Sequence, residues 1–153
     1  NMSKISNKQL KKIRGIESAI SKNLFRICSV ITVITMIMIL TEFFSRGFFP
    51  PPQIGLFYIG VLLIYSFHKE MLRWMGQKWG ERHGEWFLYS WIGLALALYI
   101  INFVTRNYFS DPSGEATVRS LSEVSIITFE VSVIFIFTRL SKTIKLILNN
   151  LKK

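Results

Sequence analysis

The stretch Ile27–Leu40, "ICSVITVITMIMIL", decides the fold of this chain, because its fourteen residues carry no charge. The apolar run extends over roughly residues 24–44, and about twenty apolar residues are enough for a helix to cross the hydrocarbon core of a bilayer. Arg26 lies near its start and Glu42 near its end. Both side chains are expected to reach toward an interface, so neither needs a functional role. The sequence therefore predicts a first transmembrane helix here.

Three further apolar segments predict spans over roughly residues 52–68, 86–105 and 121–140. The prolines at 50–52 cannot continue a helix and separate the first two spans, and Asp111-Pro112 with Ser113-Gly114 marks a turn before the fourth. Ser120 and Glu123 have the spacing of a capping box near its start. The predicted fold class is all-α: a polytopic integral membrane protein whose residues 24–140 form a four-transmembrane-helix bundle.

The two terminal segments, residues 1–23 and 141–153, are basic and amphipathic. Apolar residues recur at steps of three and four, which places them on one helical face. We expect a cytoplasmic amphipathic helix at each terminus, lying at the membrane surface, with a disordered tail as the alternative for residues 1–23. Residues 68–86 predict a surface helix or a prolongation of the second span. The residues expected to contact anionic lipid headgroups are Lys8, Lys11, Lys12, Lys142, Lys145, Trp74 and Trp79.

Basic residues are distributed unevenly between the connections. The net charge is +10, from 19 Lys and Arg against 9 Asp and Glu, and only Arg46, Arg106 and Arg119 lie outside residues 1–26, 68–86 and 139–153. The positive-inside rule then predicts that both termini and the middle loop are cytoplasmic, in a bacterial inner (plasma) membrane. Because the cations flank apolar runs, we do not expect nucleic acid as a partner.

One carboxylate interrupts the fourth span, in "SIITFEVSVIFIF" (Ser125–Phe137). Glu130 is nine residues from both Leu121 and Arg139, which at the helical rise is about 13.5 Å from each end, near the bilayer midplane. Inserting an acidic residue there costs roughly 2.5–3.5 kcal/mol. Glu123 lies two turns earlier on the same face, so the two carboxylates are candidates for a proton or cation path.

The alternative for Glu130 is structural: a protonated carboxyl that hydrogen-bonds a neighbouring helix. A contact between subunits is a third reading. Tyr99 and Asn102 on the third span are possible hydrogen-bond partners of Glu130. We also include both among the ion-path candidates. The other possible partners are Ser90, Tyr58, Tyr65, Thr32 and Thr35.

A cluster of imidazoles and carboxylates lies in the predicted middle loop. Its spacing matches no HExxH or CxxC pattern, so metal binding or acid–base chemistry is a weak hypothesis beside salt bridges to the basic neighbours. The chain has a single cysteine, Cys28, expected to act as a small hydrophobe. The members of the cluster are His68, Glu70, Glu81, His83 and Glu85.

No phosphate-binding loop, nucleophile elbow or dinucleotide fingerprint is present in the sequence. We therefore expect no cofactor and favour a non-catalytic protein. The preferred function is an accessory, anchoring or assembly module that acts through its cytoplasmic basic face on anionic lipid, on a second copy or on another membrane protein. The alternative is a homo-oligomeric proton or cation channel or transporter that uses Glu130. A holin-like membrane-perturbing protein is the third.

Overall fold

A computed structural model describes residues 2–46, 48–49, 54–74, 83–109 and 115–151. These residues form four helices and no strand: α1 (Met2–Phe44), α2 (Ile54–Trp74), α3 (His83–Val104) and α4 (Glu115–Leu151). The side chains of residues 2–14, 83–84, 115–118, 149 and 151 are not described. The predicted all-α class with four helices is confirmed.

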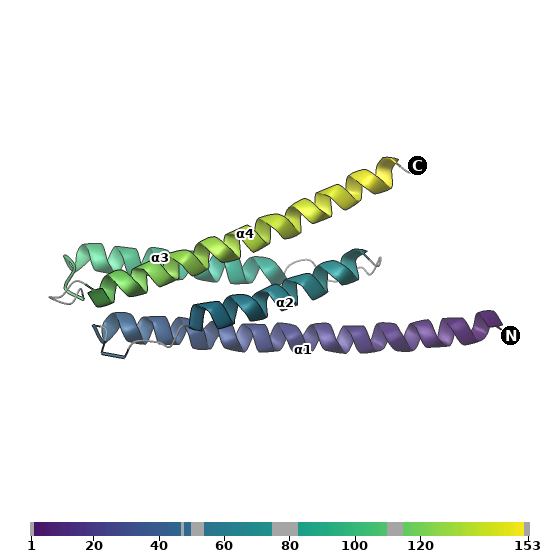
Figure 1. Ribbon diagram of the computed structural model, residues 1–153, viewed down its shortest axis with the longest axis horizontal. Helices are drawn as coiled ribbons and strands as arrows, with labels where there is room; N and C mark the ends of the chain where they lie inside the picture. Colours follow the sequence, from purple (N-terminus) through teal and green to yellow (C-terminus); the bar gives the residue numbers. More distant parts are fainter. Residues whose placement is uncertain (1, 47, 50–53, 75–82, 110–114, 152–153) are drawn as a thin grey trace.

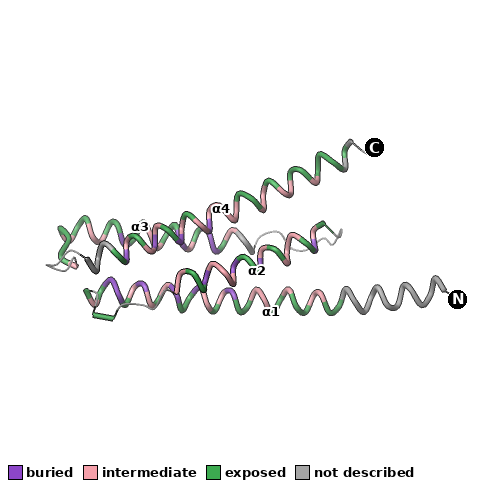
Figure 2. Tube along the Cα trace, viewed as in Figure 1, coloured by how far each residue is buried: buried purple, intermediate pink, exposed green. Residues whose placement is uncertain are grey.

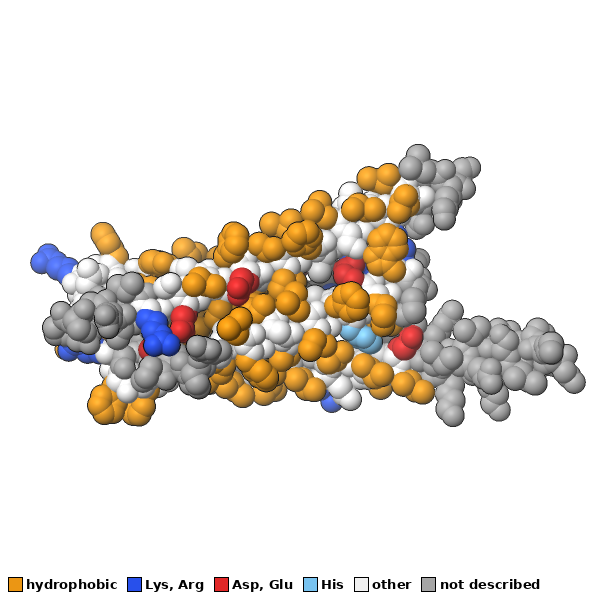
Figure 3. Space-filling model, viewed as in Figure 1, with side chains coloured by type: hydrophobic (Ala, Val, Ile, Leu, Met, Phe, Trp, Pro, Cys, Tyr) orange, Lys and Arg blue, Asp and Glu red, His pale blue; other side chains and the backbone are white. Residues whose placement is uncertain are grey.

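Each helix contains a segment that is long and apolar enough to cross a membrane by length and composition. Orange apolar side chains accordingly cover much of the face seen in Figure 3. A membrane location is compatible with this pattern. The four segments are Gly15–Phe44, Ile54–Trp74, Glu85–Val104 and Arg119–Leu148.

The four helices alternate in direction, and both chain termini lie at one end of the bundle (Figure 1). We call this the terminal end, and the opposite end, where α1 and α3 finish and α4 begins, the far end. The C-terminus of α2 and the N-terminus of α3 also lie toward the terminal end. α2 packs against α1 and α4, and α3 packs mainly against α4. The helix directions thus group the three basic segments toward one end.

The two terminal segments are helical, but they are not separate helices. Residues 2–23 continue into the rest of α1, and residues 141–151 continue from the rest of α4. No proline interrupts either sequence, and Gly15 is the only glycine in them, so nothing ends the hydrogen-bond ladder. α2 likewise continues to Trp74, so residues 68–74 prolong the second span, while residues 75–82 of the predicted segment lie outside the described residues.

The core lies along one stripe of each helix (Figure 2). On α4 this stripe is Ser120, Val124, Ile127 and Val131, at steps of four, three and four. α2 packs against α4 at Gly55, where a Cβ atom would lie 3.4 Å from Ile127 Cδ1, at van der Waals contact.

Ser120 does not cap α4, in contrast to the prediction. The helix begins at Glu115, so Ser120 lies inside it and is fully buried. The capping-box spacing recurs by chance within helices, and here the tertiary contacts of Ser120 determine its role.

The C-terminus of α3 forms a Schellman motif. Asn107 N donates to Asn102 O over 3.0 Å and Arg106 N donates to Phe103 O over 3.1 Å. This 6→1 and 5→2 pattern satisfies the last helical carbonyls. Arg106 has a φ of 50°, which an arginine adopts at a cost in free energy.

Candidate functional site

A buried hydrogen-bond chain connects the first three helices. Trp91 Nε1 of α3 donates to the Tyr58 hydroxyl of α2 over 2.7 Å, Tyr58 is hydrogen-bonded to Thr32 of α1, and Thr32 Oγ1 donates to Cys28 O over 2.7 Å. An indole nitrogen only donates and a carbonyl only accepts. The Tyr58 hydroxyl therefore accepts from Trp91, and the Thr32 hydroxyl donates to the Cys28 carbonyl.

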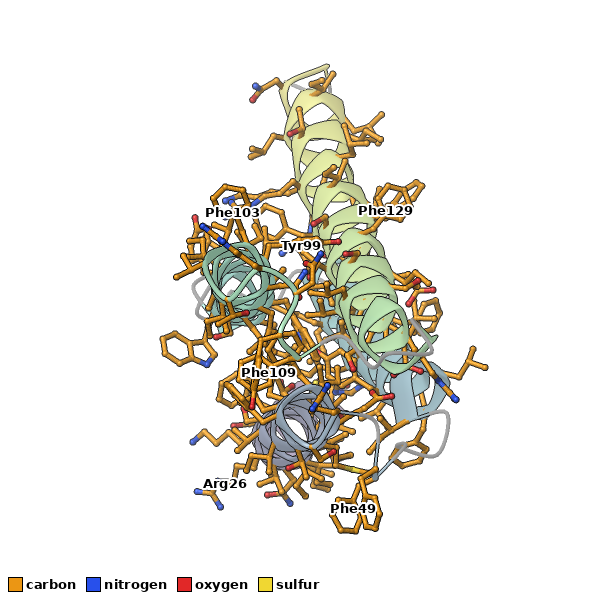
Figure 4. The ribbon with its side chains drawn as sticks, turned by 90° about the vertical axis from the view of Figure 1, so that its left-hand side faces the viewer. Arg26, Phe49, Tyr99, Phe103, Phe109 and Phe129 are labelled. Carbon is orange, nitrogen blue, oxygen red and sulfur yellow. The ribbon has the colours of Figure 1, made fainter. Side chains whose placement is uncertain are left out.

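α4 joins this chain through α3. Thr128 Oγ1 lies 3.4 Å from Trp91 O and 2.6 Å from Val124 O. Tyr99 and Ser125 share a hydrogen bond of 2.8 Å between α3 and α4, and Figure 4 shows Tyr99 between these helices. Tyr99, an ion-path candidate, is thus a helix–helix contact. Polar side chains at the middle of the bundle connect all four helices.

Glu130 lies beside the buried stripe of α4 and not on it. Its side chain is half-buried, while the next residue, Val131, is 3% exposed. The preceding residue, Phe129, is 70% exposed and points away from the bundle in Figure 4. Within the described part of the chain no residue hydrogen-bonds or ion-pairs with Glu130. Of the intramolecular partners considered for it, Tyr99 bonds Ser125, Asn102 bonds Asn107, and Tyr58 bonds Trp91.

The other two ion-path candidates lie at the far end. Glu123 Oε1 accepts from Arg119 Nε over 3.3 Å, one helical turn away. Asn102 Nδ2 donates to Asn107 Oδ1 over 2.9 Å, and Asn102 Oδ1 is buried without a partner among the described residues. Among the described residues, no chain of hydrogen bonds therefore links the four ion-path candidates, Glu123, Glu130, Asn102 and Tyr99.

Glu42 is buried, and the expectation that it reaches an interface was wrong. Its exposed fraction is 1%, because the first turns of α4 cover it: Ser120 hydrogen-bonds its carboxyl group, and the charges of Glu123 and Arg119 act on it. Within the described residues Oε2 of Glu42 has no hydrogen-bond partner. Arg119 pairs with Glu123 and not with Glu42, so an ionised Glu42 would be costly there.

A second polar group, which we call the α2–α4 clamp, lies toward the terminal end. Arg73 Nη1 of α2 pairs with Glu70 and donates to Thr138 O of α4 over 2.9 Å. Ser141 Oγ donates to Glu70 Oε2 over 2.8 Å and accepts from Trp74 Nε1 over 3.0 Å. Lys145 Nζ also donates to the Arg73 carbonyl. The clamp fixes the last turn of α2 against α4.

The clamp uses part of the predicted metal or acid–base cluster. Glu70 pairs with Arg73, and Glu85 pairs with Arg139 of α4. No group of three His, Cys, Asp or Glu side chains suited to a metal ion occurs among the described residues. Glu81 lies outside the described residues and the side chain of His83 is not described, so the five-residue cluster stays a prediction. His68 Nε2 is buried without a described partner.

The residues predicted to contact headgroups have mixed environments. Trp74 is 50% exposed while its indole nitrogen binds Ser141, and Lys145 binds the α2 backbone. Lys142 lies on α4 near the clamp and has an interaction of its own. Lys8, Lys11 and Lys12 are on α1 with side chains that are not described, and Trp79 lies outside the described residues.

A groove opens beside the clamp, along the seam between α2 and α4. It is small and partly open to the surroundings, with about 40 Å³ of enclosed space. Its floor is apolar and buried, formed by Leu62, Phe87 and Val131, and its polar rim carries Lys69 and Arg73. The remaining lining residues are Tyr65, Ser66, Ile134, Phe135 and Thr138.

Comparison with known proteins gives no family assignment. No protein-family model matches the chain, and neither a curated protein nor a solved structure is significantly similar to it.

Sequence reasoning missed the contacts of Glu42 and the Trp91–Tyr58 pair. Glu42, Thr35, Thr32 and Cys28 lie at steps of seven, three and four on α1 and are all buried. This spacing is visible in the sequence and places them on one helical face. The sequence carried no signal for which helix covers that face.

Proposed function

We propose that the chain is an integral membrane protein of non-catalytic type, an accessory or assembly module that binds a partner through two basic helical arms. The arms are residues 2–23 of α1 and 141–151 of α4, at the terminal end. The observation that carries the proposal is their position: α1 runs on beyond the end of α2, and α4, after its contacts with α2 at Ser141 and Lys145, diverges from α1 (Figure 1).

The C-terminal arm exposes apolar side chains that the bundle does not cover. Leu140, Ile144, Ile147 and Leu148 share one helical face and are 44–54% exposed. Lysines 142 and 145 flank this face. Ile16 and Ile20 form a similar exposed stripe on α1. An apolar stripe with basic flanks fits a helix or groove with acidic edges on a partner protein.

The arms are proposed to be cytoplasmic, on the basic-residue count and the helix directions together. The chain is suited to a test of this orientation, because its single cysteine, Cys28, is buried. In a Cys28→Ala background, a new cysteine at Thr143 should react with an impermeant maleimide only after cells are opened. A cysteine at Ser113 should react in intact cells. The reverse labelling pattern would contradict the orientation.

Photo-crosslinking tests the partner. A benzoylphenylalanine residue at Ile147 should give a specific cross-linked protein, and one at exposed Leu146, on another face of the same arm, should give less of it. Ile144→Glu should abolish the Ile147 adduct without changing the yield of folded protein. Equal adducts at both positions, or an adduct that survives Ile144→Glu, would refute the docking face.

A homo-oligomeric proton or cation channel is the second candidate. It is favoured by one observation: Glu130 is half-buried at the bundle surface without a partner among the described residues, so a second copy could cover it. Liposome flux measurements with Glu130→Gln test it. A measurable flux that the substitution removes would favour this candidate over the docking module. The holin-like alternative predicts loss of membrane potential on induced expression.

A further inference from the structure

The groove between α2 and α4 combines two chemistries along its length. Toward the middle of the bundle it is lined by Leu62, Tyr65 and Val131, each no more than 5% exposed. Toward the terminal end, two turns along α2, Lys69 and Arg73 lie on its rim. An apolar trough that ends in cations matches an amphiphile with an anionic head.

The described side chains around this end of the groove include more cations than carboxylates. Among the described side chains of α2, α3 and α4 here, Glu70 and Glu85 are the carboxylates. They face five cations, an excess of three positive charges, and the five are Lys69, Arg73, Arg139, Lys142 and Lys145.

Arg73 is held in place and still has donors to offer. Its two described side-chain bonds, to Glu70 and to Thr138 O, both use Nη1. A guanidinium has five N–H donors, so within the described residues those on Nε and Nη2 are left for a ligand. Lys69 Nζ lies 6.0 Å from the centre of the Tyr65 ring, over the groove. Two cations are therefore pre-positioned at the same rim.

We propose that this groove binds an anionic phospholipid, with the phosphate at Lys69 and Arg73 and one acyl chain along Tyr65, Val131 and Phe135. This lipid site rests on the proposed membrane location of the protein, and it is independent of the proposed binding of a partner by the arms. The depth is consistent, because Lys69 begins the charged segment that follows the apolar part of α2. The head group would then lie at the interface and the chain in the hydrocarbon region.

Thermal unfolding of the purified full chain in detergent tests the site. Phosphatidylglycerol should raise Tm in a saturable manner, and phosphatidylcholine with the same acyl chains should not, since only a lipid that binds the native state stabilises it. Lys69→Gln should weaken the apparent affinity about fivefold, the equivalent of ~1 kcal/mol for one cation near an anionic lipid. Ser66→Trp, which fills the groove without changing its charge, should remove the shift.

Two controls make the result specific. Lys22→Gln removes the same charge from an exposed position on α1 and should leave the phosphatidylglycerol response unchanged. Inorganic phosphate at the same concentration should give no shift, because it has no chain for the groove. Equal shifts with the two lipids, or equal losses in Lys69→Gln and Lys22→Gln, would overturn the proposal. If Ser66→Trp does not fold, the comparison of Lys69→Gln with Lys22→Gln decides alone.

Discussion

Trp91 Nε1 donates a hydrogen bond of 2.7 Å to the Tyr58 hydroxyl, and both side chains are fully buried. Their rings also pack, with centroids 5.3 Å apart. Because Tyr58 is also hydrogen-bonded to Thr32, one tyrosine links α1 and α3. In the core of a membrane helix bundle, such a contact helps to set how the helices are paired.

Tyr58→Phe should therefore destabilise the bundle by about 1–3 kcal/mol, because it leaves the buried Trp91 N–H without an acceptor. Denaturant or thermal unfolding in detergent measures this. Tyr89→Phe is the matched control, because Tyr89 is 62% exposed on the same helix as Trp91, and it should change stability by less than about 0.5 kcal/mol. Equal effects of the two substitutions would show that the hydrogen bond contributes nothing.

Glu42→Gln should leave the stability unchanged or raise it. The amide keeps the shape of the side chain and its bond to Ser120, and it removes a charge that two carboxylates and one arginine cannot balance. Glu42→Ala should destabilise by about 2 kcal/mol or more, because it leaves a cavity. The same unfolding assay distinguishes them. A loss in Glu42→Gln as large as in Glu42→Ala would mean that the fold requires an ionised carboxylate.

Arg73→Lys should open the α2–α4 clamp although it conserves the charge. An ammonium is a point charge and does not reproduce the planar fork that holds Glu70 and Thr138 O together. Hydrogen exchange of the amides in residues 138–148 should become faster. Lys22→Arg serves as a control for Lys–Arg exchange at an exposed site. Unchanged protection in Arg73→Lys would show that charge alone holds the clamp.

Arg106→Gly should stabilise the protein by about 0.5–1 kcal/mol, because glycine adopts a positive φ without steric cost. Arg26→Gly makes the same chemical change inside α1, where it should destabilise by about 1 kcal/mol. A rise in the unfolding temperature for Arg106→Gly and a fall for Arg26→Gly would confirm the left-handed backbone at the end of α3. A destabilising Arg106→Gly would mean that the arginine side chain outweighs the backbone term.

Gly55→Leu should be more destabilising than Gly60→Leu. A Cβ atom at Gly55 would already contact Ile127, whereas at Gly60 nothing lies within 4 Å. Overpacking a helix contact costs about 1–3 kcal/mol. Unfolding of the two variants side by side measures the difference, and equal losses would argue against a close approach of α2 to α4 at Gly55.

The number and class of the elements could be predicted because each follows from local properties. Length without charge predicts a spanning helix, and prolines at 50–52 predict where one cannot continue. The bounds were less accurate: the capping-box spacing at Ser120 placed the start of α4 near Leu121, while the helix begins at Glu115. A residue caps a helix only where the helix begins. A Ser-x-x-Glu pattern inside a helix has the same sequence as one at its start, so the pattern alone does not place the boundary.

The candidate site was predicted less well, because it depends on which faces meet. Glu130 attracted attention by its position in an apolar run, yet it lies beside the buried stripe of α4. Glu42, at the end of its run, is almost completely buried. Hydropathy measures the free energy of transferring a segment from water to hydrocarbon. It does not report which neighbouring helix covers a given side chain.

The sequence by itself determined four apolar helices and a grouping of basic residues, since both depend on each residue's own transfer energy and spacing along the chain. The tertiary structure alone decided that Trp91 bonds Tyr58, that α4 covers Glu42 and that Arg73 joins α2 to α4 beside a groove. Each of these contacts joins residues that lie at least 33 positions apart. The rotation and register of one helix against another create them, and no local pattern specifies either.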